Sequence, residues 1–263
     1  MPITVRDLRN FKQRGERFAM LTAYDYPTAR LLDEAGIPVL LVGDSVANNI
    51  LGYETTLPVT MEEMLHHTRA VARGTKNALV VGDMPFMSYQ TSLEEGIRNA
   101  GRFLKEGGAH AVKLEGGMYE LTAALVDRGI PVMGHLGLTP QSVHAMGGYR
   151  VQGRTEEDAN RLLDGALSLE KAGVFSLVLE GVPTKVGRRI TEAVSMPTIG
   201  IGAGPHCDGQ VLVVNDFLGL NTGTYPRFAK PYANLAEVIT SAAKEFLADV
   251  AEGRFPNEAH SYH

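Results

Sequence analysis

The chain has 263 residues, and its 30 Asp and Glu residues outnumber its 25 Lys and Arg residues, which leaves a formal net charge of −5. This balance argues against a nucleic-acid-binding protein, because affinity for phosphate backbones depends on clustered positive charge. No stretch approaches the roughly 20 consecutive apolar residues that a membrane-spanning helix needs. The N-terminus lacks the pattern of a secretory signal, and the one cysteine, Cys207, rules out an intramolecular disulfide. We therefore expect a cytoplasmic protein that binds neither nucleic acid nor membrane.

Short apolar runs alternate with amphipathic stretches from residue 18 towards the C-terminus, a pattern typical of α/β folds. The runs predict strands at residues 18–25, 38–45, 78–84, 109–115, 130–136, 174–180, 196–202 and 211–217. The stretches between them predict helices that include residues 61–73, 92–106, 118–127, 155–171 and 184–194. Glu-Glu pairs closely follow Thr60, Ser92 and Thr155, so three of these helices begin with a capping residue and negative charge.

The number of strand-helix units determines the predicted fold class. Eight units in about 250 residues are typical of an α/β protein of the (β/α)8 TIM barrel class. We expect a single domain over residues 1–263, with a short N-terminal extension and a flexible tail at about residues 255–263. A doubly wound sheet remains an alternative, because alternation alone does not show whether a sheet closes.

Polar side chains end most of the predicted strands. They are Asp25, Asp44, Ser45, Asp83, Lys113, Glu115, His135 and Glu180. The carboxyl ends of the strands in a parallel barrel meet on one face, which is where active sites form. Any one of these residues has a structural alternative, such as a helix cap for Asp or Ser and a hydrogen-bonded core position for His. As a group, they predict a charged pocket.

Two aspartates and a nearby glutamate predict a metal site. Asp44 and Asp83 end consecutive strands in matching contexts, LLVGDS and LVVGDM, and two neighbouring carboxylates repel unless a cation lies between them. Oxygen ligands without a cysteine or a histidine pair favour Mg²⁺, and Glu115 can support that ion directly or through water. Lys113 precedes Glu115 by two residues and points to the same side of the strand, where it needs an anion. A salt bridge to Glu115 or Asp83 is the structural alternative for Lys113.

Glu180 closes a wholly apolar strand, a position that suits a carboxylate to proton abstraction. An ion pair with Lys113 or Lys185 is the alternative. The glycine-rich segment IGIGAGP at residues 199–205 lacks the following helix and the acidic residue of a dinucleotide-binding loop. Tight packing in the barrel, or backbone close to a ligand, explains that segment better.

Eight sequence segments occur in unbroken order between about residues 5 and 230. They are TAYD (22–25), VGDS (42–45), GDMPF (82–86), VKLEGG (112–117), GHLGLTPQ (134–141), LVLEGVP (177–183), IGIGAGP (199–205) and DGQVLV (208–213). Together they closely resemble the ketopantoate hydroxymethyltransferase family. Several long motifs in order are far more specific than any one of them.

The resemblance implies a Mg²⁺-dependent (β/α)8 enzyme of pantothenate synthesis that forms a homo-oligomer, commonly a homodecamer. Its reaction moves the one-carbon unit of 5,10-methylenetetrahydrofolate to 3-methyl-2-oxobutanoate and yields 2-dehydropantoate. It implies metal binding by Asp44 and Asp83 with help from Glu115, and proton abstraction by Glu180. The residues expected to bind the 2-oxo acid or offset its charge are Asp44, Ser45, Asp83, Lys113 and His135.

Two other functions remain open at this point. The first is a metal-dependent 2-oxo acid lyase or aldolase of the phosphoenolpyruvate mutase and isocitrate lyase type, which would act without folate. No cysteine ends a predicted strand to serve as the acid that some of those lyases use. The second is a catalytically inactive barrel that binds a metabolite, but such a protein has no need for several buried charges that are costly to desolvate.

Overall fold

The computed structural model describes residues 2–221, 223 and 225–262, and the chain divides into two compact units, Met1–Val213 and Val214–His263. Within the described residues, no helix has both the length and the apolar character needed to cross a lipid bilayer. The single-domain description and the flexible tail at about residues 255–263 stay predictions, and residue 263 lies outside the described part.

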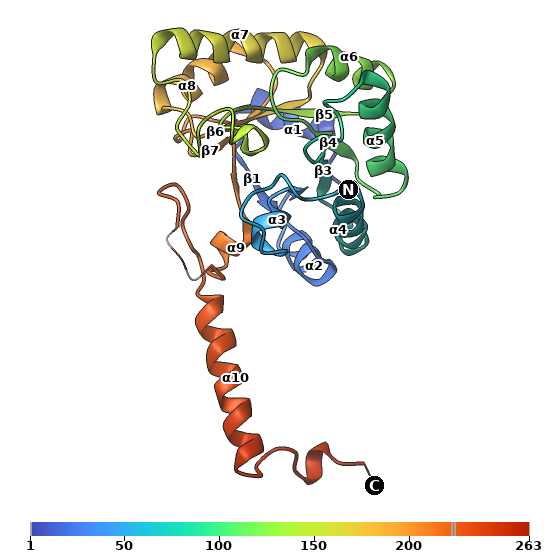
Figure 1. Ribbon diagram of the computed structural model, residues 1–263, viewed down its shortest axis with the longest axis vertical. Coiled ribbons are helices and arrows are strands. Elements are labelled where there is room, and N and C mark those ends of the chain that lie inside the picture. The colour runs from blue at the N-terminus through green and yellow to red at the C-terminus, as the bar shows by residue number, and fades with distance from the viewer. Residues whose placement is uncertain (1, 222, 224, 263) are drawn as a thin grey trace. The chain divides into compact units, whose positions relative to one another are not determined.

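The first unit is a closed barrel of eight parallel strands (Figure 1). The strands are β1 (Phe18–Thr22), β2 (Val39–Val42), β3 (Leu79–Asp83), β4 (Ala111–Lys113), β5 (Val132–Gly137), β6 (Ser176–Glu180), β7 (Thr198–Ile201) and β8 (Gly209–Leu212). Each strand pairs with the next one along the chain, and β8 pairs with β1. Because the sheet closes, the predicted barrel class is confirmed and the doubly wound alternative is wrong.

Helices and short helical turns surround or connect these strands. They are α1 (Val5–Gln13), α2 (Tyr26–Glu34), α3 (Val46–Asn49), α4 (Met61–Gly74), α5 (Leu93–Lys105), α6 (Tyr119–Asp127), η1 (Pro140–Ser142), α7 (Glu156–Ala172) and α8 (Thr184–Ala193). The hydroxyls of Thr60, Ser92 and Thr155 accept hydrogen bonds from backbone N–H groups three residues later, at 3.2, 3.1 and 3.1 Å. These bonds satisfy amides that the first helical turn leaves unpaired, so the three predicted helix starts are confirmed.

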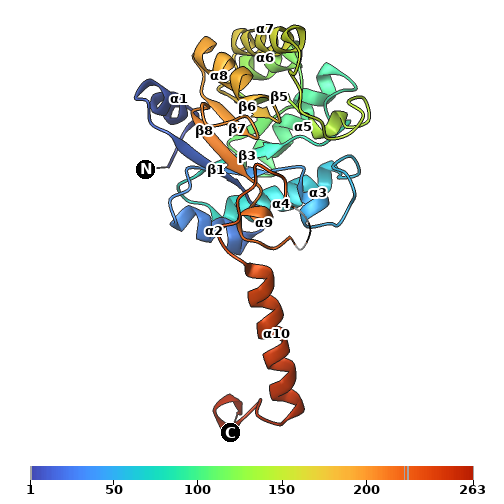
Figure 2. The ribbon, with the colours of Figure 1, turned by 90° about the vertical axis from the view of Figure 1, so that its left-hand side faces the viewer.

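The end of the barrel departs from the predicted pattern. A strand was expected at residues 211–217, but β8 ends at Leu212, and a short helix, α9 (Val214–Phe217), begins two residues later. No helix separates β7 from β8, and the two strands lie side by side with β1 in Figure 2. The connecting turn is instead packed tightly against α8, since a Cβ on Gly187 would lie 2.5 Å from the Ala203 carbonyl oxygen. This close approach supports the packing interpretation of the IGIGAGP segment.

Apolar side chains fill the barrel interior. The strands contribute Phe18, Met20, Val39, Leu41, Leu79, Val81, Ala111, Met133, Val178, Ile199 and Val211 to one buried cluster. The cluster also includes Leu8 of α1, and the Phe11 ring of that helix lies 5.8 Å from the ring of Phe18. Because Phe18 begins β1, the N-terminal extension covers the amino ends of the strands.

The second unit contains α9, α10 (Leu235–Ala251) and a short turn, η2 (Glu258–His260). Among the described residues of α10, no side chain is buried, although the helix is rich in Val, Ile, Leu and Phe. Within this unit the Phe246 ring lies 5.5 Å from the Phe255 ring. The apolar side chains of α10 are therefore mostly exposed.

Candidate active site

The inward-facing rows of the strands change from apolar to charged at their carboxyl ends. In β3, β4, β5 and β6 the core residues Val81, Ala111, Met133 and Val178 are followed two positions later by Asp83, Lys113, His135 and Glu180. Side chains two residues apart point to the same side of a strand, so these four groups face the barrel axis. The strand pattern that builds the core thus also builds a charged pocket above it.

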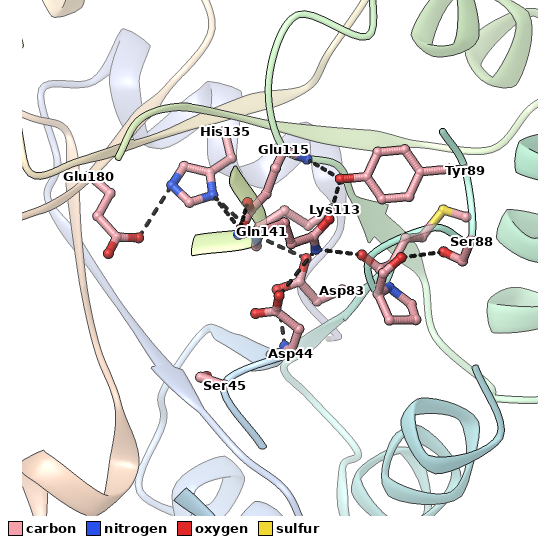
Figure 3. A network of polar contacts seen from close by, with 12 residues as sticks. Asp44, Ser45, Asp83, Ser88, Tyr89, Lys113, Glu115, His135, Gln141 and Glu180 are labelled. Carbon is pink, nitrogen blue, oxygen red and sulfur yellow. Dashed lines mark hydrogen bonds and ion pairs between the residues drawn. The ribbon is translucent and has the colours of Figure 1, made fainter. Parts of the chain in front are cut away.

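Lys113 lies at the centre of this pocket (Figure 3). Its Nζ is 2.9 Å from Asp83 Oδ1 and 3.7 Å from Glu115 Oε1, and all three side chains are buried. The salt bridge considered from the sequence therefore forms with both expected carboxylates. Burial disfavours the charge of Lys113, but the carboxylates Asp83 and Glu115 outweigh it and raise the lysine pKa. Lys113 is thus held as an ammonium ion among anions.

His135 lies between two carboxylates (Figure 3). Its Nδ1 is 3.5 Å from Glu115 Oε1, and its Nε2 is 3.3 Å from Glu180 Oε2. Burial and Lys113, whose Nζ lies 3.2 Å from Nδ1, oppose protonation of the ring. The two carboxylates prevail and raise the pKa of His135 to about 9. At neutral pH the ring is therefore a cation that forms ion pairs with both carboxylates.

Glu180 is the most accessible carboxylate of the group, with a side chain that is 17% exposed. Its charged neighbour is His135, not the Lys113 or Lys185 considered from the sequence. It ends β6, and its backbone pairs with Gly137 of β5. Glu180 thus has a fixed backbone position and a partly exposed carboxylate that a bound molecule can reach.

Asp44 and Asp83 meet at the ends of β2 and β3. The backbone N–H of Asp44 donates a hydrogen bond to Asp83 Oδ2 at 3.1 Å, and both side chains are buried. Burial, followed by repulsion from Asp83 and Glu115, raises the pKa of Asp44 well above its usual range. Burial also raises the pKa of Asp83, although Lys113 opposes this effect. Negative charge at this pair is therefore only partly compensated by the protein's own cations.

Glu115 behaves differently from the two aspartates. Burial opposes its ionisation, but Lys113 and His135 outweigh burial and lower the pKa of Glu115. Its Oε2 also accepts a hydrogen bond from the backbone N–H of Gln141 at 3.0 Å. Glu115 is thus an ionised carboxylate that already has partners, whereas Asp44 and Asp83 lack a full complement of positive charge.

The oxygen-rich pair fits a hard divalent cation. Within the described residues, no three or more His, Cys, Asp and Glu side chains are arranged as a ready-made metal cage. Mg²⁺ commonly takes only one or two protein carboxylates and keeps several waters, so Asp44 and Asp83 satisfy its usual demand. A divalent cation there would offset the burial and the repulsion from Asp83 and Glu115 that raise the pKa of Asp44. Glu115 lies close enough to both aspartates to raise their pKa values.

Ser45 borders the pocket, and Asp25 has another role. The Ser45 hydroxyl is 2.8 Å from the hydroxyl of Tyr24, so the two side chains share a hydrogen bond. Asp25 accepts a hydrogen bond from the backbone N–H of Thr28 at 2.8 Å and is the N-cap of α2. Of the polar strand ends identified in the sequence, Asp25 is thus a helix cap and not a pocket residue.

Three further residues of the pocket were not predicted from the sequence. Gln141 contacts both Asp44 and Glu115, and Tyr89 contacts Gln141 and the Glu115 backbone. Tyr149 is half exposed, and burial, Asp44 and Glu180 raise its pKa. Gln141 ends the GHLGLTPQ motif, but uncharged side chains in loops carry no strand-end signal.

Comparison with known proteins assigns the chain to a family. The family model for ketopantoate hydroxymethyltransferase matches residues 2–258. The 3-methyl-2-oxobutanoate hydroxymethyltransferase of Geobacter metallireducens is 56% identical over 261 residues, covering 98% of each chain. The enzyme of the same name from Syntrophus aciditrophicus is 57% identical over 262 residues, covering 99% of this chain and 96% of that protein.

Solved structures share the fold at much lower identity. A phosphonopyruvate hydrolase, crystallised with oxalate and Mg²⁺, aligns with a TM-score of 0.63 at 13% identity and covers 98% of this chain and 93% of its own. At this identity the likeness shows a common barrel only. The relatives above 50% identity carry the functional assignment instead, and they favour the transferase over the lyase and inactive-barrel alternatives. The chain therefore belongs to the ketopantoate hydroxymethyltransferase family and is an enzyme that transfers a hydroxymethyl group to 3-methyl-2-oxobutanoate in pantothenate synthesis.

Proposed function

We propose that the enzyme uses Mg²⁺ and takes its one-carbon unit from 5,10-methylenetetrahydrofolate, forming 2-dehydropantoate and tetrahydrofolate. The observation that carries this proposal is the buried Asp44–Asp83 pair, whose charge is incompletely offset, beside the cationic Lys113 and His135. A 2-oxo acid is an anion with two adjacent oxygen donors, so it matches a pocket that offers a cation and ammonium or imidazolium donors.

Asp44 and Asp83 are the residues that would hold the metal, with Glu115 assisting directly or through water. When bound, the ion would act as a Lewis acid that stabilises negative charge on the keto oxygen and acidifies the neighbouring C–H group. Ser45 lies beside Asp44 in sequence, and its hydroxyl is held by Tyr24, a position suited to contact the substrate. Lys113 offsets the remaining negative charge of the 2-oxo acid.

Glu180 is the proposed proton acceptor. Its partly exposed carboxylate removes the proton from C3, the branched carbon of 3-methyl-2-oxobutanoate, while the His135 ring at 3.3 Å orients it. The electron pair left on C3 then forms a bond to the methylene carbon of the folate, and the bond from that carbon to one folate nitrogen breaks. Water replaces the second folate nitrogen at the same carbon and becomes the hydroxyl group of the product. The proton from C3 and one proton from water are taken up by the two nitrogens of the departing tetrahydrofolate.

Tyr149 is the aromatic side chain that we propose for the folate. The chain contains no Trp, so aromatic contact with the pterin must come from Tyr or Phe. Tyr149 is 55% exposed, and its pKa is raised by burial and then by Asp44 and Glu180, which supports a position near the pocket entrance. An exposed ring beside reacting groups offers a stacking surface for a planar heterocycle.

We further propose a homo-oligomer, a homodecamer by resemblance to the family, located in the cytoplasm. The exposed apolar side chains of α10 support association, because such surfaces are costly in water. The single cysteine, Cys207, cannot form an intramolecular disulfide, which fits a reducing compartment.

Hydrogen-deuterium exchange at C3 of 3-methyl-2-oxobutanoate, followed by NMR, tests this function. We expect exchange that requires Mg²⁺ and stops when a chelator is added. When methylenetetrahydrofolate is added, we expect the 2-oxo acid to be converted to 2-dehydropantoate. Glu180→Gln should lose exchange while still binding the 2-oxo acid. Tyr149→Ala should keep exchange, which needs no folate, and raise the KM for methylenetetrahydrofolate. Full exchange by Glu180→Gln, or metal-independent exchange by the wild type, would contradict the assignment.

A further inference from the structure

We infer that Gln141 is a positioning residue that holds the carboxylates of Asp44 and Glu115 in place, and that Tyr89 fixes the orientation of its amide. This inference rests on the proposed function, because these two carboxylates belong to the proposed metal site. Neither residue would touch the substrate in this role. Both would act through hydrogen bonds to the carboxylates or to each other.

Gln141 links two strand ends through separate groups (Figure 3). Its side-chain Nε2 donates to Asp44 Oδ2 at 3.1 Å, and its backbone N–H donates to Glu115 Oε2 at 3.0 Å. The same Nε2 donates to the Met84 carbonyl oxygen at 2.9 Å, so both of its hydrogens have acceptors. One buried residue in η1 therefore connects the carboxylates that follow β2 and β4.

Tyr89 determines which way the Gln141 amide points. A tyrosine hydroxyl has one proton, and here it accepts a hydrogen bond from the Glu115 backbone N–H at 3.1 Å. Its own proton is therefore available for Gln141 Oε1, which lies 2.7 Å away. Gln90 Nε2 donates to the same oxygen at 3.2 Å. With Oε1 occupied by donors, Nε2 must face Asp44.

The loop that carries Tyr89 is itself anchored to the barrel. Asn99 of α5 donates to the Ser88 carbonyl oxygen at 2.7 Å, and the Ser88 hydroxyl donates to the Pro85 carbonyl oxygen at 2.7 Å. Met87 adopts a φ of 64°, a left-handed conformation that is uncommon for a residue with a side chain. Hydrogen bonds therefore hold the loop that carries Tyr89 in one position.

A neutral donor is what the two carboxylates require. Asp44 is repelled by Asp83 and Glu115, so without a partner its side chain would rotate away from the position that a metal ion needs. A second lysine would compete with the metal for the same oxygens, whereas an amide donates without neutralising them. Groups that orient metal ligands in this way commonly change metal affinity by about 10- to 100-fold when they are removed.

Mn²⁺ titration of the metal-free enzyme, followed by electron paramagnetic resonance of free Mn²⁺, tests the inference. We expect Gln141→Met to raise the Kd for Mn²⁺ by about 10- to 100-fold, and Tyr89→Phe to raise it by a smaller factor in the same direction. The double variant should lose less affinity than the sum of the two single losses, because Tyr89 acts on Asp44 through Gln141 and has a contact of its own only at the Glu115 backbone N–H. Additive losses would overturn the assigned role of Tyr89.

Thr68→Val is the matched control, since it removes a buried hydroxyl that donates to the Met64 carbonyl oxygen outside the pocket. Its Kd for Mn²⁺ should equal that of the wild type. Wild-type affinity in both Gln141→Met and Tyr89→Phe would overturn this inference and leave the proposed metal site intact. A wild type that binds no Mn²⁺ would instead overturn the proposed metal site. Tyr89→Phe keeps the ring, so the test survives if Gln141→Met fails to fold.

Discussion

His135 shows how single residues in this pocket depend on partners from other strands. The ring is buried, which by itself favours the neutral form. Glu115 and Glu180 stand on either side and stabilise the charged form, so the pKa rises to about 9. The charge of His135 therefore contributes to the folding stability of the enzyme.

A raised pKa in the folded state makes stability depend on pH. The stabilisation is complete below the unfolded pKa of about 6.5 and is lost as pH rises through about 9. For the metal-free enzyme we expect the free energy of unfolding to fall over this interval, on the order of 3 kcal/mol from His135. Urea unfolding at pH 6, 7, 8 and 9 measures this fall in the free energy of unfolding.

His135→Asn is the comparison that isolates this residue. The raised pKa values of Asp44 and Asp83 add a decline of the same sign that starts at lower pH and remains in the variant. The variant should therefore show a shallower decline between pH 6.5 and 9. Parallel wild-type and variant profiles would contradict a protonated His135 in the folded enzyme.

At the scale of elements, the contact between β3 and α5 positions the proposed metal ligand. Gly82 precedes Asp83 and packs against the ring of Phe103, which is fully buried on α5. A Cβ on Gly82 would overlap that ring. The absence of a side chain at residue 82 lets the helix approach the strand closely, just before the strand presents its carboxylate.

Gly82→Ala should therefore destabilise the protein by about 1–3 kcal/mol, because overpacking forces strand and helix apart. Gly101→Ala, in α5, the helix that carries Phe103, is the matched control. A Cβ at Gly101 meets no atom within 4 Å, so the change should stabilise by about 0.5–1 kcal/mol through helix propensity. Thermal unfolding of both variants gives the two values. A neutral Gly82→Ala would mean that the β3–α5 contact is looser than described.

At the scale of the whole molecule, the apolar residues of α10 bear on assembly. Ile239, Phe246 and Val250 are spaced by seven and four residues and so lie along one face of the helix. All three are exposed, Ile239 to 52%. A helix of this kind is stabilised mainly by packing its apolar face against another surface.

Ile239→Asp should lower the molecular mass of the assembly in solution, because it places a carboxylate in the proposed contact. Lys244→Asp introduces the same side chain on another face of α10 and should leave the mass unchanged. Native mass spectrometry distinguishes these outcomes. A wild-type enzyme of 28.4 kDa in solution would contradict the proposed oligomer.

The prediction of the barrel depended on local patterns in the sequence. Short apolar runs, capped helices and polar strand ends depend on residues close together in the chain. The caps at Thr60, Ser92 and Thr155 form as predicted for this reason. The same locality explains the error at residues 211–217, since a continuous apolar run does not reveal where strand pairing with β1 stops.

The sequence by itself determined the alternation of strands and helices, the family and the charged residues that end the strands. Only the tertiary structure decided that the sheet closes, that Asp25 caps a helix, and that His135 rather than a lysine faces Glu180. Only the tertiary structure joined Tyr89 to Gln141, 52 positions apart in the chain. The physical reason is that hydrogen bonds between loops depend on how distant segments are placed in space, which no local pattern of polarity encodes.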